Sequence, residues 1–169
     1  LDDFVPCLHN ILRDQSYERK IKLPALHALG DLCLYSGEQF HQKYLDGTLT
    51  ILSMAARMST QTQAHVDDVD TLEFLSELRE EIIDQYIIIL MAAGDTGRLA
   101  HFNPVLETIF DFLEATVQIE GYANTKIIKM IIALLGDIAT SFPQNDGVKS
   151  KSTLPYVEQG ILVLQQQPN

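Results

Sequence analysis

Acidic side chains crowd one short part of the sequence, between residues 67 and 84. Several of them recur at steps of three and four residues, which places them on one side of a helix. Such a surface attracts Lys- and Arg-rich segments by steering and by charge-assisted hydrogen bonds, although a solvated loop and helix face is the alternative. Eight carboxylates occur there against one basic residue, Arg79: Asp67, Asp68, Asp70, Glu73, Glu77, Glu80, Glu81 and Asp84.

The whole chain shares this acidic balance. It has 169 residues, of which 12 are Lys or Arg and 23 are Asp or Glu, so its formal net charge is −11. That charge disfavours a protein that follows nucleic-acid phosphates, and it favours a basic protein or peptide as the partner. The longest apolar run, residues 86–93, is too short to cross a bilayer, so we expect no membrane insertion.

Residue types that support catalysis or bind metals are present but scattered. No His-x-x-x-His or Cys-x-x-Cys pair occurs, and no glycine-rich phosphate loop or G-x-S-x-G motif is found. We therefore predict no enzymatic activity, no metal site and no cofactor. Cys7 and Cys33 lie in apolar helical patterns, so we expect buried free thiols. The histidines are His9, His27, His41, His65 and His101.

The elements that carry these residues are all predicted to be helices, because no window alternates cleanly with a period of two. Helical periodicity covers residues 21–34, 37–57, 72–93 and 124–141, and Asn103-Pro104 is typical of the start of another helix. The expected class is all-α.

The predicted helices fall into antiparallel pairs of similar length, about three and a half in all, which is typical of HEAT arrays. Each pair stacks on its neighbours because it cannot bury its own apolar face. The expected units are residues 1–36, whose first helix is possibly truncated, 37–94 with an acidic insertion at 59–71, 100–142, and 152–169 as the first helix of a further, truncated unit.

A Leu-Gly-Asp-aliphatic tetrad occurs twice, at Gly30-Asp31 and again at Gly136-Asp137. Glycine costs about 1 kcal/mol relative to alanine inside a helix. We interpret both glycines as marks of the repeat, where a neighbouring helix approaches closely. Asp31 and Asp137 are interpreted as polar staples to an adjacent repeat, with an acidic inner ladder as the alternative.

Several stretches, taken together and in order, resemble the C-terminal HEAT-repeat region of importin-β (karyopherin-β1) nuclear import receptors. They are "IKLPALHALGDL", "YSGEQFHQKYL", "VDTLEFLSELREEIIDQYIIIL" and "LLGDIATSFP". The resemblance covers residues 14–143, and it favours a chain that is a piece of a longer protein.

The resemblance implies a right-handed superhelical solenoid that carries cargo through nuclear pores. Such receptors bind importin-α or basic cargo signals, bind phenylalanine-glycine (FG) nucleoporins, and release cargo when Ran-GTP binds. It also implies a location in the cytoplasm, the nucleus and the nuclear pore. The alternative is a HEAT scaffold of another assembly with no transport role.

Two sets of residues are candidates for these contacts. Glu77, Glu80, Glu81 and Asp84 are expected to face the groove that takes a basic segment. FG repeats need shallow apolar slots between neighbouring first helices, although core packing is the favoured role for each residue taken alone. The candidate walls of such slots are Phe40, Tyr44, Phe110, Phe112 and Leu113.

Overall fold

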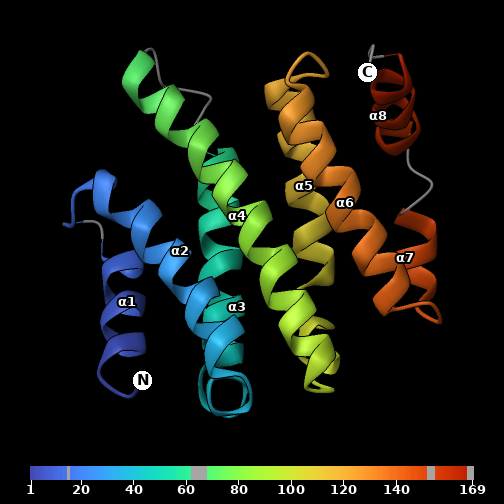
Figure 1. The fold of residues 1–169 in the computed structure, drawn as a ribbon. Helices are drawn as coiled ribbons and strands as arrows, with labels where there is room; N and C mark the ends of the chain where they lie inside the picture. The colour runs from blue at the N-terminus through green and yellow to red at the C-terminus, as the bar shows by residue number, and fades with distance from the viewer. Residues whose placement is uncertain (15, 62–67, 152–154, 167–169) are drawn as a thin grey trace.

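The computed structural model describes residues 1–14, 16–61, 68–151 and 155–166, and these form α-helices and one short 3-10 helix. The helices stand side by side in two layers (Figure 1). The elements are α1 (Phe4–Arg13), α2 (Arg19–Ser36), α3 (Glu38–Gln61), α4 (Val69–Asp95), η2 (Leu99–Phe102), α5 (Leu106–Glu120), α6 (Thr125–Ser141), α7 (Asp146–Lys151) and α8 (Pro155–Gln165).

Helices of the same layer pack on one another in chain order. In the first-helix layer α1 packs on α3 and α3 on α5, while in the second-helix layer α2 packs on α4 and α4 on α6. Each first helix also packs against the second helix that follows it. Helices α1 and α8 consequently lie at opposite ends of the stack (Figure 1). This arrangement is an all-α solenoid of helix pairs, and it confirms the predicted fold class.

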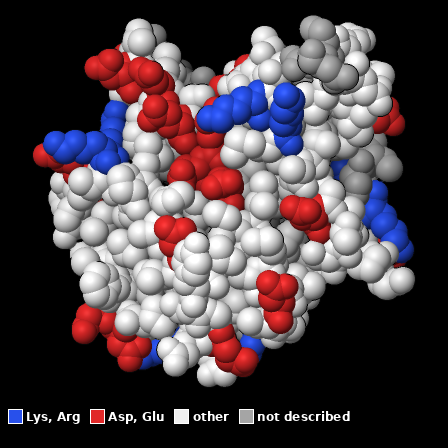
Figure 2. Space-filling view, in the orientation of Figure 1, with Lys and Arg blue, Asp and Glu red and all other residues white. Residues whose placement is uncertain are grey.

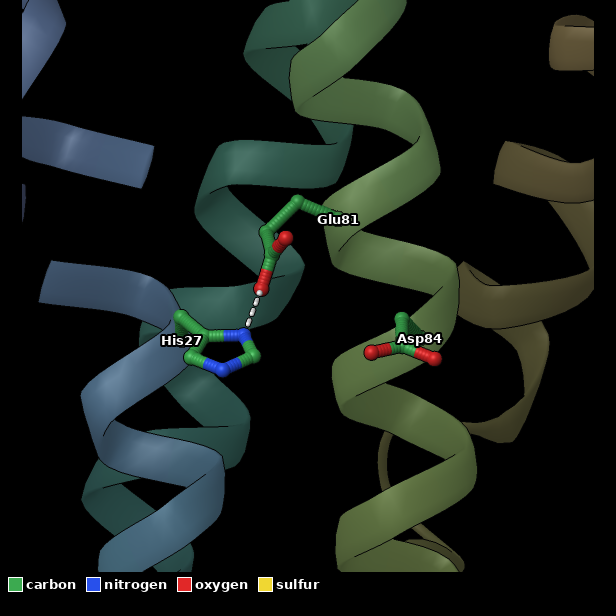
Figure 3. A group of neighbouring side chains, drawn as sticks. All are labelled: His27, Glu81 and Asp84. Carbon is green, nitrogen blue, oxygen red and sulfur yellow. Dashed lines mark hydrogen bonds and ion pairs between the residues drawn. The ribbon is translucent and has the colours of Figure 1, made fainter. Parts of the chain in front are cut away.

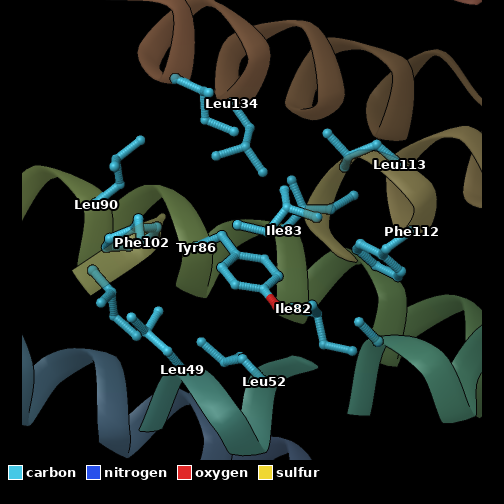
Figure 4. Close-up of a cluster of buried hydrophobic side chains, with 14 of the residues drawn as sticks. Leu49, Leu52, Ile82, Ile83, Tyr86, Leu90, Phe102, Phe112, Leu113 and Leu134 are labelled. Atoms are coloured by element: carbon cyan, nitrogen blue, oxygen red, sulfur yellow. The ribbon is translucent and has the colours of Figure 1, made fainter. Parts of the chain in front are cut away.

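Helix α4 is the centre of the molecule, because it packs against α2, α3 and α6. Its side chains Ile82, Ile83 and Tyr86 are fully buried, and Figure 4 shows them between Leu52 of α3 and Leu134 of α6. Burying side chains of this size contributes about 1.5–3 kcal/mol each. Within the described ranges, no helix combines the length and the apolar character that a membrane span requires.

Capping residues and glycines set the helix ends. Asp68 begins α4: its carboxylate accepts a hydrogen bond from the Thr71 backbone N–H at 3.1 Å. Hydrogen bonds from the Thr71 side chain and backbone hold the pKa of Asp68 below its usual value. Gly37 ends α2 with φ of +51° and Gly121 ends α5 with φ of +71°, a region in which side chains with a Cβ are strained.

The start of α5 differs from the prediction. The helix begins at Leu106, and Asn103-Pro104 lies in a turn after the short helix η2. The physical reason is Phe102, which is 0% exposed. The short helix η2 places the Phe102 ring in the core, and α5 begins only after it.

The C-terminal part also differs from expectation. Residues 152–169 were expected to form a first helix, but α8 packs against α6. This is the position of a second helix, because it is equivalent to the packing of α4 against α2. The six-residue helix α7 precedes α8 in the chain, and α6 contacts it as well.

Candidate functional site

The acidic face of α4 comprises Asp70, Glu73, Glu77, Glu80, Glu81 and Asp84. The first three are exposed and the other three are half-buried. They form a column of carboxylates on the second-helix layer (Figure 2). The four residues predicted to bind a basic segment therefore lie together on one surface. Of the other two predicted acids, Asp68 caps the helix and Asp67 lies outside the described residues.

Arg79, the basic residue within this acidic run, does not neutralise the acidic face. Its side chain is turned inward and is 1% exposed. Its Nε donates to Glu120 Oε1 at 2.8 Å, its Nη2 lies 2.6 Å from the same oxygen, and its Nη1 donates to the Ser59 carbonyl at 2.7 Å. The charge of Arg79 is thus neutralised in the interior, where α3, α4 and α5 meet. It does not offset the negative potential of the outward carboxylates.

Neighbouring helices supply partners for two of the half-buried acids, Glu80 and Glu81. Lys126 of α6 forms an ion pair with Glu80, and this contact raises the pKa of Lys126. His27 Nδ1 of α2 lies 3.2 Å from Glu81 Oε1. Basic side chains adjoin the acidic column on the α6 side (Figure 2). The open part of the face is therefore Asp70, Glu73 and Glu77.

The shape of the acidic face suits an extended chain better than a small molecule. From residue 70 to residue 84 a helix rises about 21 Å, which is the span of about six residues of extended peptide. The carboxylates lie along one face of the helix. The arrangement can align several Lys or Arg side chains by charge-assisted hydrogen bonds.

The apolar candidates for nucleoporin binding all lie in the core. None of the five is more than 8% exposed, although Phe110 and Tyr44 each line a surface pocket. All five pack in the interior because their stripes face the second-helix layer. They are Phe40, Tyr44, Phe110, Phe112 and Leu113.

Open apolar grooves do exist between neighbouring first helices. One, of about 280 Å³, lies between α5 and α7, and there Phe110 and Leu106 form part of the wall. The other, of about 250 Å³, lies between α1 and α3. Met54 and Met58 on its rim are 53% and 37% exposed. The walls of the α1–α3 groove include Leu12, Ile51, Met54, Ala55 and Met58.

The two repeat glycines occupy different surroundings. A Cβ added at Gly30 would lie 1.7 Å from Oε1 of Gln85, so α4 approaches α2 closely there. Gly136 is exposed, and nothing lies within 4 Å of the place its Cβ would take. The expected close approach therefore holds at Gly30 and is wrong for Gly136.

The aspartates that follow these glycines are both exposed. Asp31 lies 3.8 Å from His27 Nε2, on its own helix one turn away. It therefore makes this contact within α2 and not as a staple to the next repeat. Asp137 faces solvent on α6.

The two cysteines differ in exposure. Cys33 is buried as predicted, its Sγ lies 3.0 Å from His41 Nε2, and burial raises the pKa of its thiol to about 12. Cys7 is exposed, contrary to the prediction. Helix α1 stands at the edge of its layer, so neighbouring helices cover only one of its sides.

Sequence spacing does not predict the contacts that three further side chains make with the acidic face. They are His27, Gln85 and Lys126. His27 and Lys126 lie 54 and 46 residues from their acidic partners. Helical periodicity carries no information at such separations. A signal was present only for Met54 and Met58, whose four-residue spacing outside the main stripe of α3 indicates one exposed patch.

Comparison with known proteins agrees with this architecture. Importin subunit beta-1 of Schizosaccharomyces pombe is 26% identical over 145 residues, which are 86% of this chain and 16% of that protein. The chain thus spans a small part of the relative's length. A solved structure, in which Kap95p binding induces the switch loops of RanGDP to adopt the GTP-bound conformation, matches with a TM-score of 0.77. It is 22% identical and covers 95% of this chain and 18% of that one, and it shows the fold.

The family comparison covers nearly the whole sequence. Residues 1–161 match the family described as importin subunit beta-1-like, TPR repeats. The predicted resemblance is thereby confirmed. Because the match leaves out only the last residues of the chain, this protein belongs to the importin subunit beta-1-like family.

Proposed function

We propose that this chain is part of a nuclear import receptor and that the acidic face of α4 binds Lys- and Arg-rich segments. The segment is either the importin-β-binding domain of importin-α or a basic signal in a cargo protein. Family membership and the accessible column of carboxylates support this assignment. The inward position of Arg79 carries it, because it leaves the face uniformly acidic.

The carboxylates of the acidic face lower the stability of α4 by repelling one another, which a surface with only a structural role does not require. Carboxylates four residues apart on a helix destabilise it by about 0.2–0.5 kcal/mol per pair. Glu73, Glu77 and Glu81 form two such pairs in succession. A basic peptide relieves this repulsion when it binds, and its association rate gains from the same field.

Roles that depend on the longer protein belong to this proposal too. We infer that the complete receptor responds to Ran-GTP and moves between cytoplasm and nucleus through the nuclear pore. The relative solved with RanGDP supports the choice of Ran as the regulator.

Binding of a fluorescent importin-β-binding peptide tests the proposal. The double variant Glu77→Lys, Asp84→Lys should bind about tenfold or more weakly at low salt, because two attractive charges become repulsive. The matched control is Asp3→Lys, Glu107→Lys, which reverses two exposed acids elsewhere and should keep the affinity of the parent. Binding should also weaken as salt is raised.

Equal losses in the two double variants would mean that net charge, and not the acidic face, holds the peptide. Failure of the parent chain to bind any basic import segment would favour the scaffold role.

A second function is favoured by the groove between α1 and α3. We propose that it accepts a phenylalanine side chain of an FG repeat, because its lining is mainly apolar, with Arg13 and Lys22 also present, and Met54 lies exposed on its rim. Methionine adapts to aromatic rings and permits weak, rapidly exchanging contacts. The proposed FG contact therefore lies at Met54 and its groove, and not at the buried candidates Phe40, Tyr44, Phe110, Phe112 and Leu113.

An NMR titration with an FG peptide tests this second function. Met54→Lys should remove the chemical-shift changes around the groove. Met91→Lys is the matched control, since Met91 on α4 is equally exposed at 54%. Shifts that persist in the Met54 variant would move the site elsewhere.

A further inference from the structure

Three side chains from two helices converge at the edge of the acidic face. His27 reaches from α2 toward Glu81 of α4, and Asp84 lies one turn further along α4 (Figure 3). One potential ligand atom from each residue lies within 4.8 Å of the other two. His27 is 56% exposed and Glu81 22% exposed, so solvent reaches the group.

The donor set is one imidazole nitrogen and two carboxylate oxygens, which is a combination that Zn²⁺ accepts in proteins. Ligand atoms around a tetrahedral zinc are about 3.3–3.5 Å apart. The group therefore has to contract by up to about 1.5 Å, which rotation of an exposed imidazole and a half-buried carboxylate allows. Mg²⁺ and Ca²⁺ prefer sites built only from oxygen ligands, so the histidine favours zinc.

The surrounding contacts orient two of these ligands. His27 presents Nδ1 to Glu81, and its other nitrogen, Nε2, lies 3.8 Å from the Asp31 carboxylate. A metal-binding histidine commonly donates its second N–H to a carboxylate, which fixes the tautomer. Gln85 Nε2 donates to Glu81 Oε1 at 2.7 Å and holds that carboxylate from behind.

Gln85 also has an unused acceptor. Its side chain is 1% exposed, and within the described part of the chain its Oε1 has no hydrogen-bond partner. A buried unpaired carbonyl oxygen is costly. This oxygen lies against Gly30 of α2, since a Cβ added there would come within 1.7 Å of it, while the amide nitrogen faces Glu81. The amide therefore holds the Glu81 carboxylate through its nitrogen.

We propose that His27, Glu81 and Asp84 bind one Zn²⁺ ion, with Asp31 beside the imidazole and the Gln85 amide holding the Glu81 carboxylate. The ion joins α2 to α4. The proposal does not depend on peptide binding, because it rests on the donor atoms and their placement alone.

Calorimetric titration of the whole chain with zinc chloride tests this site. A Cys7→Ser background removes the exposed thiol, which is a competing zinc ligand. We expect one zinc ion per chain, an affinity loss of at least tenfold in His27→Gln and in Asp84→Asn, and a smaller loss in Asp31→Asn. Magnesium chloride in large excess should not displace the zinc.

His101→Gln is the matched control. His101 Nδ1 lies 2.6 Å from Asp46 Oδ1, so it is also a histidine paired with a carboxylate, but it belongs to no group of three metal-binding side chains among the residues described. This variant should bind zinc like its parent. Absence of stoichiometric binding, or equal affinity in His27→Gln and His101→Gln, would overturn the proposal. The ¹⁵N shifts of the His27 ring provide a second readout, since coordination must move them.

Discussion

The two faces of α4 carry opposite kinds of chemistry. The outward face holds six carboxylates on the second-helix layer. The inward face buries Arg79, Gln85 and Tyr86, which are 1%, 1% and 0% exposed. One helix thus places its positive charge in the interior and its negative charges in solvent.

This contrast separates stability from recognition within a single element. Arg79 and Tyr86 form hydrogen bonds with other helices, so their loss should be felt mainly in unfolding. Outward carboxylates repel one another and have few partners, so their loss should be felt mainly in binding. Four predictions test this division, in order of decreasing expected effect.

Arg79→Ala should lower the free energy of unfolding by about 3 kcal/mol. It removes the counter-charge of Glu120, whose Oε2 keeps its hydrogen bonds from Ser76 and Asn124, and it removes a donor from the Ser59 carbonyl. Removing one member of a buried ion pair is strongly destabilising. Urea unfolding followed by circular dichroism measures the change. Arg57→Ala is the control: Arg57 also joins α3 to α5, through Thr108 at 3.0 Å, but it is exposed and should cost less than about 1 kcal/mol.

The stability that Tyr86 contributes should be lost at high pH. Burial raises the pKa of Tyr86 to about 12, whereas an unfolded tyrosine titrates near 10. The neutral phenol is therefore favoured in the folded state. Its contribution is complete below pH 10 and is lost as the pH rises toward 12.

The measurement for Tyr86 is urea unfolding at a series of pH values, compared with Tyr86→Phe. Between pH 10 and 11.5 the stability of the parent should fall relative to the variant, by up to about 2 kcal/mol. Comparison with the variant removes the parallel effect of Cys33, whose pKa is raised in the same direction. Parallel curves would show that the Tyr86 hydroxyl titrates normally.

The two repeat glycines should respond differently to alanine. Gly136→Ala should raise the free energy of unfolding by about 0.5–1 kcal/mol, because the site is open and alanine favours helix. Gly30→Ala should lack this gain, since the new methyl group displaces the Gln85 amide. In a Gln85→Ala background the obstacle is gone, so Gly30→Ala should then stabilise. Equal effects of the two glycine substitutions in the parent would contradict the close approach of α2 and α4.

Neutralising the acidic face should change stability least. Glu77→Gln should raise the free energy of unfolding by about 0.3 kcal/mol at low salt, because it removes repulsion from Glu73 and Glu81. The gain should vanish in concentrated salt, which screens exposed charges. A loss of more than about 1 kcal/mol would mean that this carboxylate has a structural partner and would break the contrast between the two faces.

Much of the fold could be predicted from the sequence, because helical periodicity is local. The apolar residues of α4 and its regularly spaced acidic residues lie within a few helical turns of one another. The spacing alone therefore predicts which side of the helix each set occupies. The start of α5 was mispredicted, since Asn103-Pro104 is locally a good helix start and the burial of Phe102 overrides it. The aromatic candidates are buried, although Phe110 still forms part of a groove wall, because exposure depends on the neighbouring helix and not on the residue type.

The sequence by itself determined the helical class and the one-sided acidity of α4, since each depends on residues close together in the chain. Several stretches taken in order indicated the family. Only the tertiary structure decided that Arg79 turns inward, that Gly30 but not Gly136 meets another helix, and that His27 joins Glu81 and Asp84. These outcomes depend on contacts between segments more than forty residues apart. At such separations the packing of one helix on another, and not the repeat pattern within either helix, sets which atoms meet.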